Sequence, residues 1–561
     1  MSTRVTTAFA MLSLLLASCA PAAPLAAPTA PAAKPTAAPA PTSAPTSAPA
    51  AKPTELPKPA PTTAPAAAAK PTEASLIKPA VAAPAGTLVI ANQSDLESGH
   101  PFLNYQHNAE SVIRHVFDNL LEATPDGQLV PGLAESYRIV DDKTIEFKLR
   151  RGVKFHNGED FNADAVKFSV ERMQDPETKS GVAAGYKSIE KVSVVDPYTV
   201  QFNLAQPDAG LLWALAYQLA ALPPRYYQEV GIQGFAQKPI GTGPYKFVEW
   251  VRGDHVTLEA NENYWQGSPK GMPGVKTVIF RPIQEESTRV AALQSGQVQI
   301  ARNIPSDLAA SLETAETGTM TVAATTLPII HLDAKNDGPT KDARVRQALN
   351  YAIDVETIMK DLRRTPGNRL AAPLSQSTLG YDPSLKPYTY DPAKAKQLLA
   401  EAGYANGFET KLDYANLEPK QVVEALQAYL GAVGVKAELV PYELGTFNQI
   451  WVSQPDKVAP LRFGTWGGKV DPNNLELFIT CNGLLSRYCN PRVDELWTQQ
   501  KTIYDQAQRA KLIGELAKIL HEDAAQVYLY PVVEFYGVSK KVKGLQLAKD
   551  GQLRVYGVTL Q

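Results

Sequence analysis

The residues best able to bind metal ions or act as nucleophiles are sparse in this chain of 561 residues, which has seven histidines and three cysteines. Three cysteines are too few for a disulfide scaffold or a cysteine-rich zinc module. His100, His107 and His115 form no His-x-x-x-His pair, so their spacing does not support nickel capture, and no metal site or cofactor is predicted. The Gly-x-Ser-x-Gly and His-Glu-x-x-His motifs of hydrolases are absent from the sequence, whereas carboxylate pairs for glycoside cleavage stay open. These patterns favour binding over catalysis.

Cys19 ends a segment that is typical of an export signal. Arg4 is followed by a short apolar run, Ala8 to Ala17, which is too short to span a bilayer. The run ends in Leu16-Ala17-Ser18-Cys19, which matches the lipobox of bacterial lipoproteins. That resemblance implies a signal peptide over residues 1–18, acylation of Cys19 and a lipid anchor outside the cytoplasm, in the periplasm or at the outer cell surface. The alternative is a secreted protein with a chance cysteine there.

Residues 19–85 form a linker built almost wholly of Ala, Pro, Thr and Ser. The segment shows no apolar periodicity, so it cannot bury enough surface to offset the entropy lost on ordering the backbone. We expect it to be disordered and extended, and to hold a folded body away from a membrane. A neutral spacer is the alternative, and the sequence does not show whether the segment is glycosylated.

Cys481 and Cys489 enclose a short loop. In an exported protein, this spacing predicts a disulfide, worth about 2 to 3 kcal/mol in the chain-entropy model. Metal binding or thiol catalysis is the weaker alternative, because only two thiols are present and no histidine is near them in the sequence.

The remaining chain has a balanced charge, with 55 Lys and Arg against 57 Asp and Glu. This balance argues against a nucleic-acid partner, because phosphate binding needs a surplus of cations. Helical and strand patterns alternate from Gly86 to the C-terminus, which predicts a mixed α/β body of more than one lobe. We expect strands at 87–91, 144–149, 435–440, 461–466 and 528–533, and helices at 109–121, from 162, at 342–360, 392–402, 419–433 and 491–526.

Beyond these patterns, the body resembles the extracytoplasmic solute-binding proteins of ABC importers, family 5, the peptide/nickel-binding group. The segments that carry this resemblance, in the order of that family, are LEATPDGQLVPGLAESY (121–137), RRGVKFHNG (150–158) with FNADAV (161–166), GTGPY (241–245) with NENYW (261–265), VRQALNYAID (345–354), and DPAKA (391–395) with GY (403–404). Most of these residues identify the fold rather than the site. The glycines of GTGPY suit a turn and a close backbone approach.

The resemblance implies a two-lobed periplasmic-binding-protein-like α/β fold, class II and large, with an extra subdomain in the first lobe. The first lobe would comprise 86–326 with 533–561, and the second 327–532. Crossovers would lie near 325–332 and 531–538. Such lobes close on a ligand by a hinge motion.

The resemblance also points to ligand-binding residues. In the second lobe these are Trp466, as a flat apolar surface, with Lys469 and Asp471. Peptide-binding relatives often carry an Asp where this chain has Lys469, and a cation would repel a peptide's ammonium group. Lys469 would therefore accept an anionic or hydroxyl-rich ligand, or face solvent. In the first lobe, Gln93, Tyr105 and His107 follow the opening strand.

The predicted function is a non-enzymatic, monomeric lipoprotein that captures a peptide or similar small solute and delivers it to a membrane permease. An oligosaccharide or other polar solute, and a metal chelate, are alternative ligands. An exported hydrolase, and a sensor or adhesion lipoprotein that reuses the fold, are alternative functions.

Overall fold

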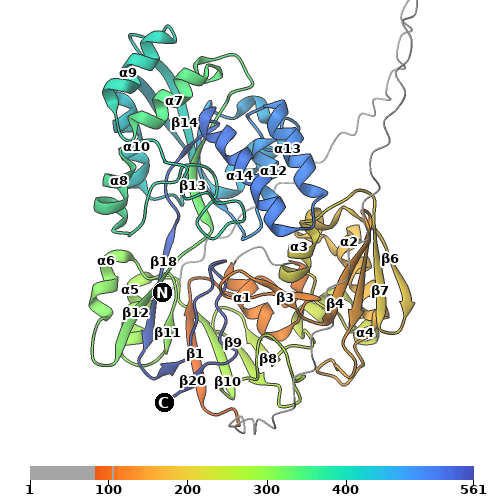
Figure 1. Cartoon of the computed structure of the whole chain (residues 1–561). Helices are drawn as coiled ribbons and strands as arrows, with labels where there is room; N and C mark the ends of the chain where they lie inside the picture. The colour runs from red at the N-terminus through yellow and green to blue at the C-terminus, as the bar shows by residue number, and fades with distance from the viewer. Residues whose placement is uncertain (1–82, 104–106) are drawn as a thin grey trace, which may run out of the picture. The chain divides into compact units, whose positions relative to one another are not determined.

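Two large sheets organise the described residues of the chain (Figure 1). The computed structural model describes residues 83–103 and 107–561, without the side chains of residues 107 and 108. The seven-stranded sheet has the order β12 (Thr317–Ala323), β18 (Val533–Ser539), β11 (Ile300–Ala301), β1 (Thr87–Asn92), β10 (Thr277–Pro282), β9 (His255–Ala260) and β8 (Tyr245–Val251). The five-stranded sheet has the order β15 (Val435–Tyr442), β14 (Phe408–Ala415), β16 (Leu461–Gly467), β13 (Thr326–Leu332) and β17 (Gln526–Tyr528). We call the parts built on these sheets the first and second lobes.

Each lobe has its own helices and its own apolar core. In the first lobe these helices are α1 (His107–Val116), α2 (Ala163–Gln174), α3 (Leu211–Tyr217), α4 (Pro224–Gln237), α5 (Glu286–Gln294) and α6 (Ser306–Ala309). In the second they are α7 (Ala343–Ala352), α8 (Val355–Thr357), α9 (Pro392–Glu401), α10 (Lys420–Ala432), α11 (Leu444–Ser453), α12 (Glu476–Ile479), α13 (Pro491–Lys501) and α14 (Gln506–Glu522). None of the helices in the described part of the chain has the length and apolarity needed to cross a membrane.

Two short segments connect the lobes. The chain passes from β12 to β13 through residues 324–325 and returns from β17 to β18 through residues 529–532. The segments are hydrogen-bonded to each other, because Ala324 N donates to Val532 O (2.8 Å) and Val532 N donates to Thr326 O (2.9 Å). The strand expected at 528–533 is in fact this return segment with one strand residue at each end, and its Leu529 and Tyr530 pack in the apolar core of the second lobe.

A four-stranded antiparallel sheet is inserted in the first lobe. Its order is β4 (Ala134–Asp141), β5 (Thr144–Leu149), β7 (Thr199–Leu204) and β6 (Ile189–Asp196). Helix α2 packs on it, and the Asn162 side chain accepts a hydrogen bond from Ala165 N (3.1 Å), the N-cap that the sequence predicts. The hairpin of β2 (Leu121–Ala123) and β3 (Leu129–Pro131) precedes it.

The GTGPY turn lies directly against the end of α1. Gly243 N donates to Val116 O (2.9 Å), and a Cβ atom at Gly241 would lie only 2.1 Å from the same oxygen. The glycines therefore allow the close backbone approach that the sequence predicts. Since this contact uses the carbonyl of Val116, α1 ends there rather than continuing to Leu121 as expected.

A buried ion pair lies in the core of the second lobe. The Arg462 guanidinium lies 3.4 Å from the ring centroid of Phe447 and 4.6 Å from that of Trp451, and its Nη1 donates to Asp413 Oδ2 (2.8 Å). Both charged side chains are 1% exposed. Burial raises the pKa of Asp413 to about 6, because the loss of water outweighs the attraction of Arg462.

This pKa predicts how stability changes with pH. The pKa of Asp413 is about 6 in the folded state and near 3.8 in the unfolded chain, so the folded state holds the proton more tightly. The contribution of Asp413 to the free energy of unfolding therefore falls as pH rises from about 4 to about 6. The Asp413→Asn variant should lack this decline. Urea unfolding of both proteins at pH 4, 5, 6 and 7 measures the difference, and a contribution that rises with pH would show that Arg462 dominates instead.

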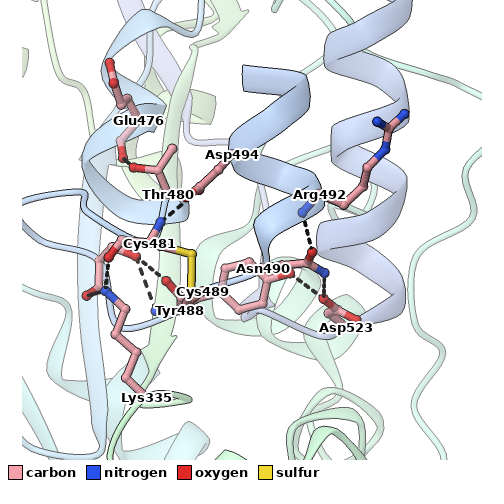
Figure 2. Close-up of a disulfide and its surroundings, with 11 residues drawn as sticks. Lys335, Glu476, Thr480, Cys481, Tyr488, Cys489, Asn490, Arg492, Asp494 and Asp523 are labelled. Carbon is pink, nitrogen blue, oxygen red and sulfur yellow. Dashed lines mark hydrogen bonds between the residues drawn. A yellow bond between two sulfur atoms is a disulfide. The ribbon is translucent and has the colours of Figure 1, made fainter. Parts of the chain in front are cut away.

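Cys481 and Cys489 are joined by a disulfide in the second lobe (Figure 2). The enclosed loop is held from outside as well: Asp494 accepts from Cys481 N (2.9 Å), and Lys335 Nζ donates to Cys481 O (2.7 Å) and Ser486 O (2.9 Å). These bonds fix the loop between α12 and α13.

Replacing both cysteines by serine should lower the free energy of unfolding by about 2 to 3 kcal/mol, because the unfolded chain gains loop entropy. Because the loop keeps its hydrogen bonds, ligand binding should be retained. Urea unfolding with and without reductant tests this: reductant should destabilise the parent protein and leave the double variant unchanged. A double variant as stable as the oxidised parent would contradict the prediction.

Candidate functional site

The loop after β16, residues 468–472, is held rigidly within the second lobe. Asp471 forms a buried ion pair with Arg509 of α14, whose Nη2 donates to Asp471 Oδ1 (3.0 Å) while Nη1 contacts Oδ2. The two side chains are 2% and 0% exposed. On the other side, Thr325 Oγ1 donates to Gly468 O (2.7 Å), which ties the loop to the first connecting segment.

Lys469 extends from this loop to the first lobe. Its Nζ lies 3.5 Å from Glu110 Oε2 of α1 and 5.5 Å from the ring centroid of Tyr217 at the end of α3. The side chains of Lys469 and Glu110 are 23% and 11% exposed. Lys469 therefore faces the other lobe in this structure, and water screens the pair only in part.

Glu110 also accepts hydrogen bonds within the first lobe. Gln218 Nε2 donates to its Oε1 (3.1 Å), and Gln552 Nε2 donates to its Oε2 (2.7 Å). We call Glu110, Tyr217, Gln218, Lys469 and Gln552 the interlobe cluster. It offers one carboxylate, one ammonium group, two amides and an aromatic ring.

Apolar and backbone contacts bring the lobes together around this cluster. Val470 packs with Ala123, Trp213 and Tyr217, and Ala209 N donates to Lys501 O (2.8 Å). At Gly210 a Cβ atom would lie 1.7 Å from Asn473 Nδ2, so a side chain here would have to displace the Asn473 amide.

A small pocket lies beside the cluster. Its volume is about 20 Å³, and Glu110, Arg114, Asn119, Tyr217 and Gln218 are among the residues that line it. This space suits about one water molecule and is far below the several hundred Å³ of typical ligand pockets. A larger ligand would therefore have to separate the two lobes at the cluster.

The other predicted site residues lie elsewhere or outside the described residues. Trp466 is 8% exposed within an apolar cluster, and its ring meets that of Phe478 edge-on at 5.7 Å. Gln93 is exposed just after β1. Tyr105 and Cys19 lie outside the described residues, as does the side chain of His107, at the first position of α1. The carboxylate of Asp471 is held by Arg509, so a ligand could bind it only if that ion pair broke.

The first-lobe members of the cluster were not found from the sequence. Glu110 lies in α1, Gln218 at the end of α3 and Gln552 in the C-terminal segment. The hydrogen-bonded residues Glu110 and Gln552 are thus 442 positions apart. No short-range spacing marks them. In the expected helix 109–121, Glu110 lies at the edge of the apolar face, where charged residues are common, so the helical pattern does not single it out.

No group of three or more His, Cys, Asp or Glu suited to a metal ion occurs among residues 83–103 and 107–561. His115 is buried, with Nδ1 2.6 Å from Ser111 O and Nε2 accepting from Val555 N (3.2 Å). His100 is also buried, and its Nε2 lies 3.0 Å from the Tyr227 hydroxyl. Burial lowers the pKa of His115 to about 3 and that of His100 to about 4, so both rings are neutral parts of the first-lobe core.

Comparison with known proteins identifies the family. Residues 128–483 match the model of bacterial extracellular solute-binding proteins, family 5. The chain belongs to this family. A curated relative, the glutathione-binding protein GsiB of Pectobacterium atrosepticum, is 30% identical over 491 residues, which cover 84% of this chain and 94% of the relative.

Solved structures of this family share the fold. DppA of Helicobacter pylori, a periplasmic binding protein in complex with the peptide STSA, is 26% identical, with a TM-score of 0.72 over 85% of this chain and 98% of that one. NikZ of Campylobacter jejuni, in complex with Ni(L-His), is 27% identical, with a TM-score of 0.70 over 84% and 99%.

These findings confirm the family and the two-lobed α/β fold predicted from the sequence. The family 5 protein is therefore an extracytoplasmic solute-binding protein of the ABC-importer type, and its relatives are binding proteins rather than enzymes.

Proposed function

We propose that this family 5 protein captures a short peptide or a similar small zwitterion between its lobes and delivers it to a membrane permease. The observation that carries the proposal is the Lys469–Glu110 pair, which joins the two lobes at 3.5 Å. A ligand with one carboxylate and one ammonium group can replace both partners, because Lys469 then pairs with the carboxylate and Glu110 with the ammonium group.

The polar groups around the pair support such a ligand. The amides of Gln218 and Gln552 donate to Glu110 and hold its carboxylate in place. The carboxylate would therefore need to turn only slightly to face the ammonium group of a ligand. The relatives named above bind, by their own names, glutathione, a peptide and a nickel–histidine complex. All three ligands contain amino-acid groups, which agrees with a zwitterionic ligand here.

In this proposal the first lobe comprises residues 86–326 and 533–561, the second comprises 327–532, and the hydrogen-bonded connecting segments act as the hinge. Trp466 remains a predicted contact of the ligand, and acylation of Cys19 remains the predicted anchor. A stable closed form would be the state that the permease recognises, since a ligand shifts the population only as far as it binds that form better.

The experiment is native mass spectrometry of ligand co-purified with the full chain, followed by calorimetry with short peptides. Peptides with free termini should bind, and acetylated or amidated versions should bind about tenfold more weakly, because each loses one charge-assisted hydrogen bond. An oligosaccharide as the co-purified ligand would replace the peptide proposal. Chemical turnover of the bound ligand would indicate the exported hydrolase instead.

A further inference from the structure

A second pocket lies within the first lobe, between the β2–β3 hairpin and the C-terminal segment from Gly544. Its volume is about 240 Å³, and no described residue of the second lobe lines it. Three cations, Arg114, Lys270 and Arg554, and one carboxylate, Glu122, are part of its lining. It shares Arg114 with the small pocket beside the interlobe cluster, but none of the five residues of that cluster lines it.

The carboxylate that lines this pocket is already engaged. Glu122 Oε1 accepts from Asn119 N (3.0 Å) and lies 3.2 Å from Lys270 Nζ, and its Oε2 accepts from Arg114 Nη2 (3.0 Å). Lys270 also pairs with Asp118 (3.0 Å) behind the wall and donates to Phe117 O (2.6 Å). The carboxylate on the wall thus has no need of a cationic ligand.

The donors at the pocket are in surplus. Arg554 is 6% exposed, and its Nη2 pairs with Asp550, but its Nε and Nη1 have no hydrogen-bond partner among the described residues. The hydroxyl of Tyr556 (7% exposed) and Nε of Arg114 are likewise unpartnered within the described part of the chain. Unpartnered buried donors are costly, and a guanidinium cannot lose its proton to relieve the cost.

We propose that this pocket binds a small anion, through carboxylate or phosphate oxygens that accept from Arg554 and Tyr556. Each of the three lining cations already faces a carboxylate: Arg114 pairs with Glu122, Lys270 with Asp118 and Arg554 with Asp550. What favours an anion is therefore the set of unpartnered donors on Arg554 and Tyr556, which only a hydrogen-bond acceptor can satisfy. The volume is below that of pockets for drug-sized ligands, so the occupant is a small molecule. The site uses none of the five residues of the interlobe cluster, so the proposal does not depend on the solute proposed there.

The test is calorimetric titration of the full chain with inorganic phosphate and, separately, with acetate, at constant ionic strength. At least one of the two anions should bind saturably at a single site. Binding of phosphate would indicate a phosphate-bearing ligand, and binding of acetate would indicate a carboxylate. Arg554→Lys keeps the charge but removes Nε and Nη1, so affinity should fall about tenfold. Tyr556→Phe should lower it about threefold while folding normally, since the hydroxyl has no hydrogen-bond partner to lose among the described residues.

Matched controls come from the exposed Arg151 and the half-buried Tyr198 of the same lobe, where the guanidinium lies 4.3 Å from the ring centroid. Arg151→Lys and Tyr198→Phe should leave anion affinity unchanged, as should Lys469→Met in the interlobe cluster. Absence of saturable binding of both anions would overturn the proposal. So would binding that neither pocket variant weakens. If Arg554→Lys does not fold, the result with Tyr556→Phe decides alone.

Discussion

The Arg509→Leu variant is expected to lose about 3 to 5 kcal/mol of stability, because it leaves the Asp471 carboxylate buried without a charged partner. Asp471 is 2% exposed, so water cannot take the place of the guanidinium. Arg509 also donates to Gln500 Oε1 (2.6 Å) and Asn473 Oδ1 (3.1 Å), and both bonds are lost together with the ion pair. Urea and thermal unfolding measure the loss.

Two further variants separate the ion pair from general damage to α14. The double change Asp471→Leu with Arg509→Leu removes both charges, and should recover most of the stability, because an apolar pair no longer carries an unpaired charge. Lys511→Met, at an exposed position of the same helix, should change stability by less than about 0.5 kcal/mol. If the free energy of unfolding of the Arg509→Leu variant is within about 1 kcal/mol of that of the parent, the role given to the ion pair is refuted.

The Lys469→Glu variant is expected to open the ligand-free protein and to weaken ligand binding. The new carboxylate would face Glu110 across the gap that now measures 3.5 Å between Nζ and Oε2. Two like charges near 4 Å repel by a few kcal/mol at an effective dielectric of about 20, and partial exposure reduces this to about 1 to 2 kcal/mol. The affinity for a zwitterionic peptide should fall about tenfold or more.

A charge exchange provides the control. Glu110→Lys combined with Lys469→Glu restores opposite charges and should recover a closed form, while Lys469→Met should lie between the parent and Lys469→Glu. Small-angle scattering reports the opening as a larger radius of gyration, and calorimetry reports the affinity. If Lys469→Glu scatters and binds like the parent, the pair does not link the lobes in solution.

Local sequence patterns predicted many elements of this fold well. The strands at 87–92 and 144–149 follow from their apolar patterns, and the helix after Asn162 follows from its cap. The helix expected at 491–526 is two helices, because Asp505 caps a new one by accepting from Gln508 N (2.8 Å). The buried residues of α13, such as Val493, and those of α14, such as Ile513, would lie on opposite faces of one continuous helix, so a change of phase in the apolar pattern marks the break.

The site was less accessible to such reasoning. The second-lobe loop with Lys469 was identified through the family resemblance, but its partner Glu110 is 359 positions earlier and nothing local connects the two. Long-range pairs of this kind depend on topology, and short-range spacing carries no information about it. The unpartnered donors of Arg554 and Tyr556 were equally invisible, since hydrogen-bond satisfaction exists only once the chain is folded.

The strand order of the seven-stranded sheet has a consequence for how the protein is made. Strand β18 lies between β12 and β11, yet it begins at Val533, after the whole second lobe has been synthesised. The first lobe therefore cannot finish folding on the ribosome or during export until nearly the last residues arrive. Until then two strand edges remain unpaired, and such edges invite pairing with other chains. Chains that stop short of β18 should thus be prone to aggregation as well as unable to bind.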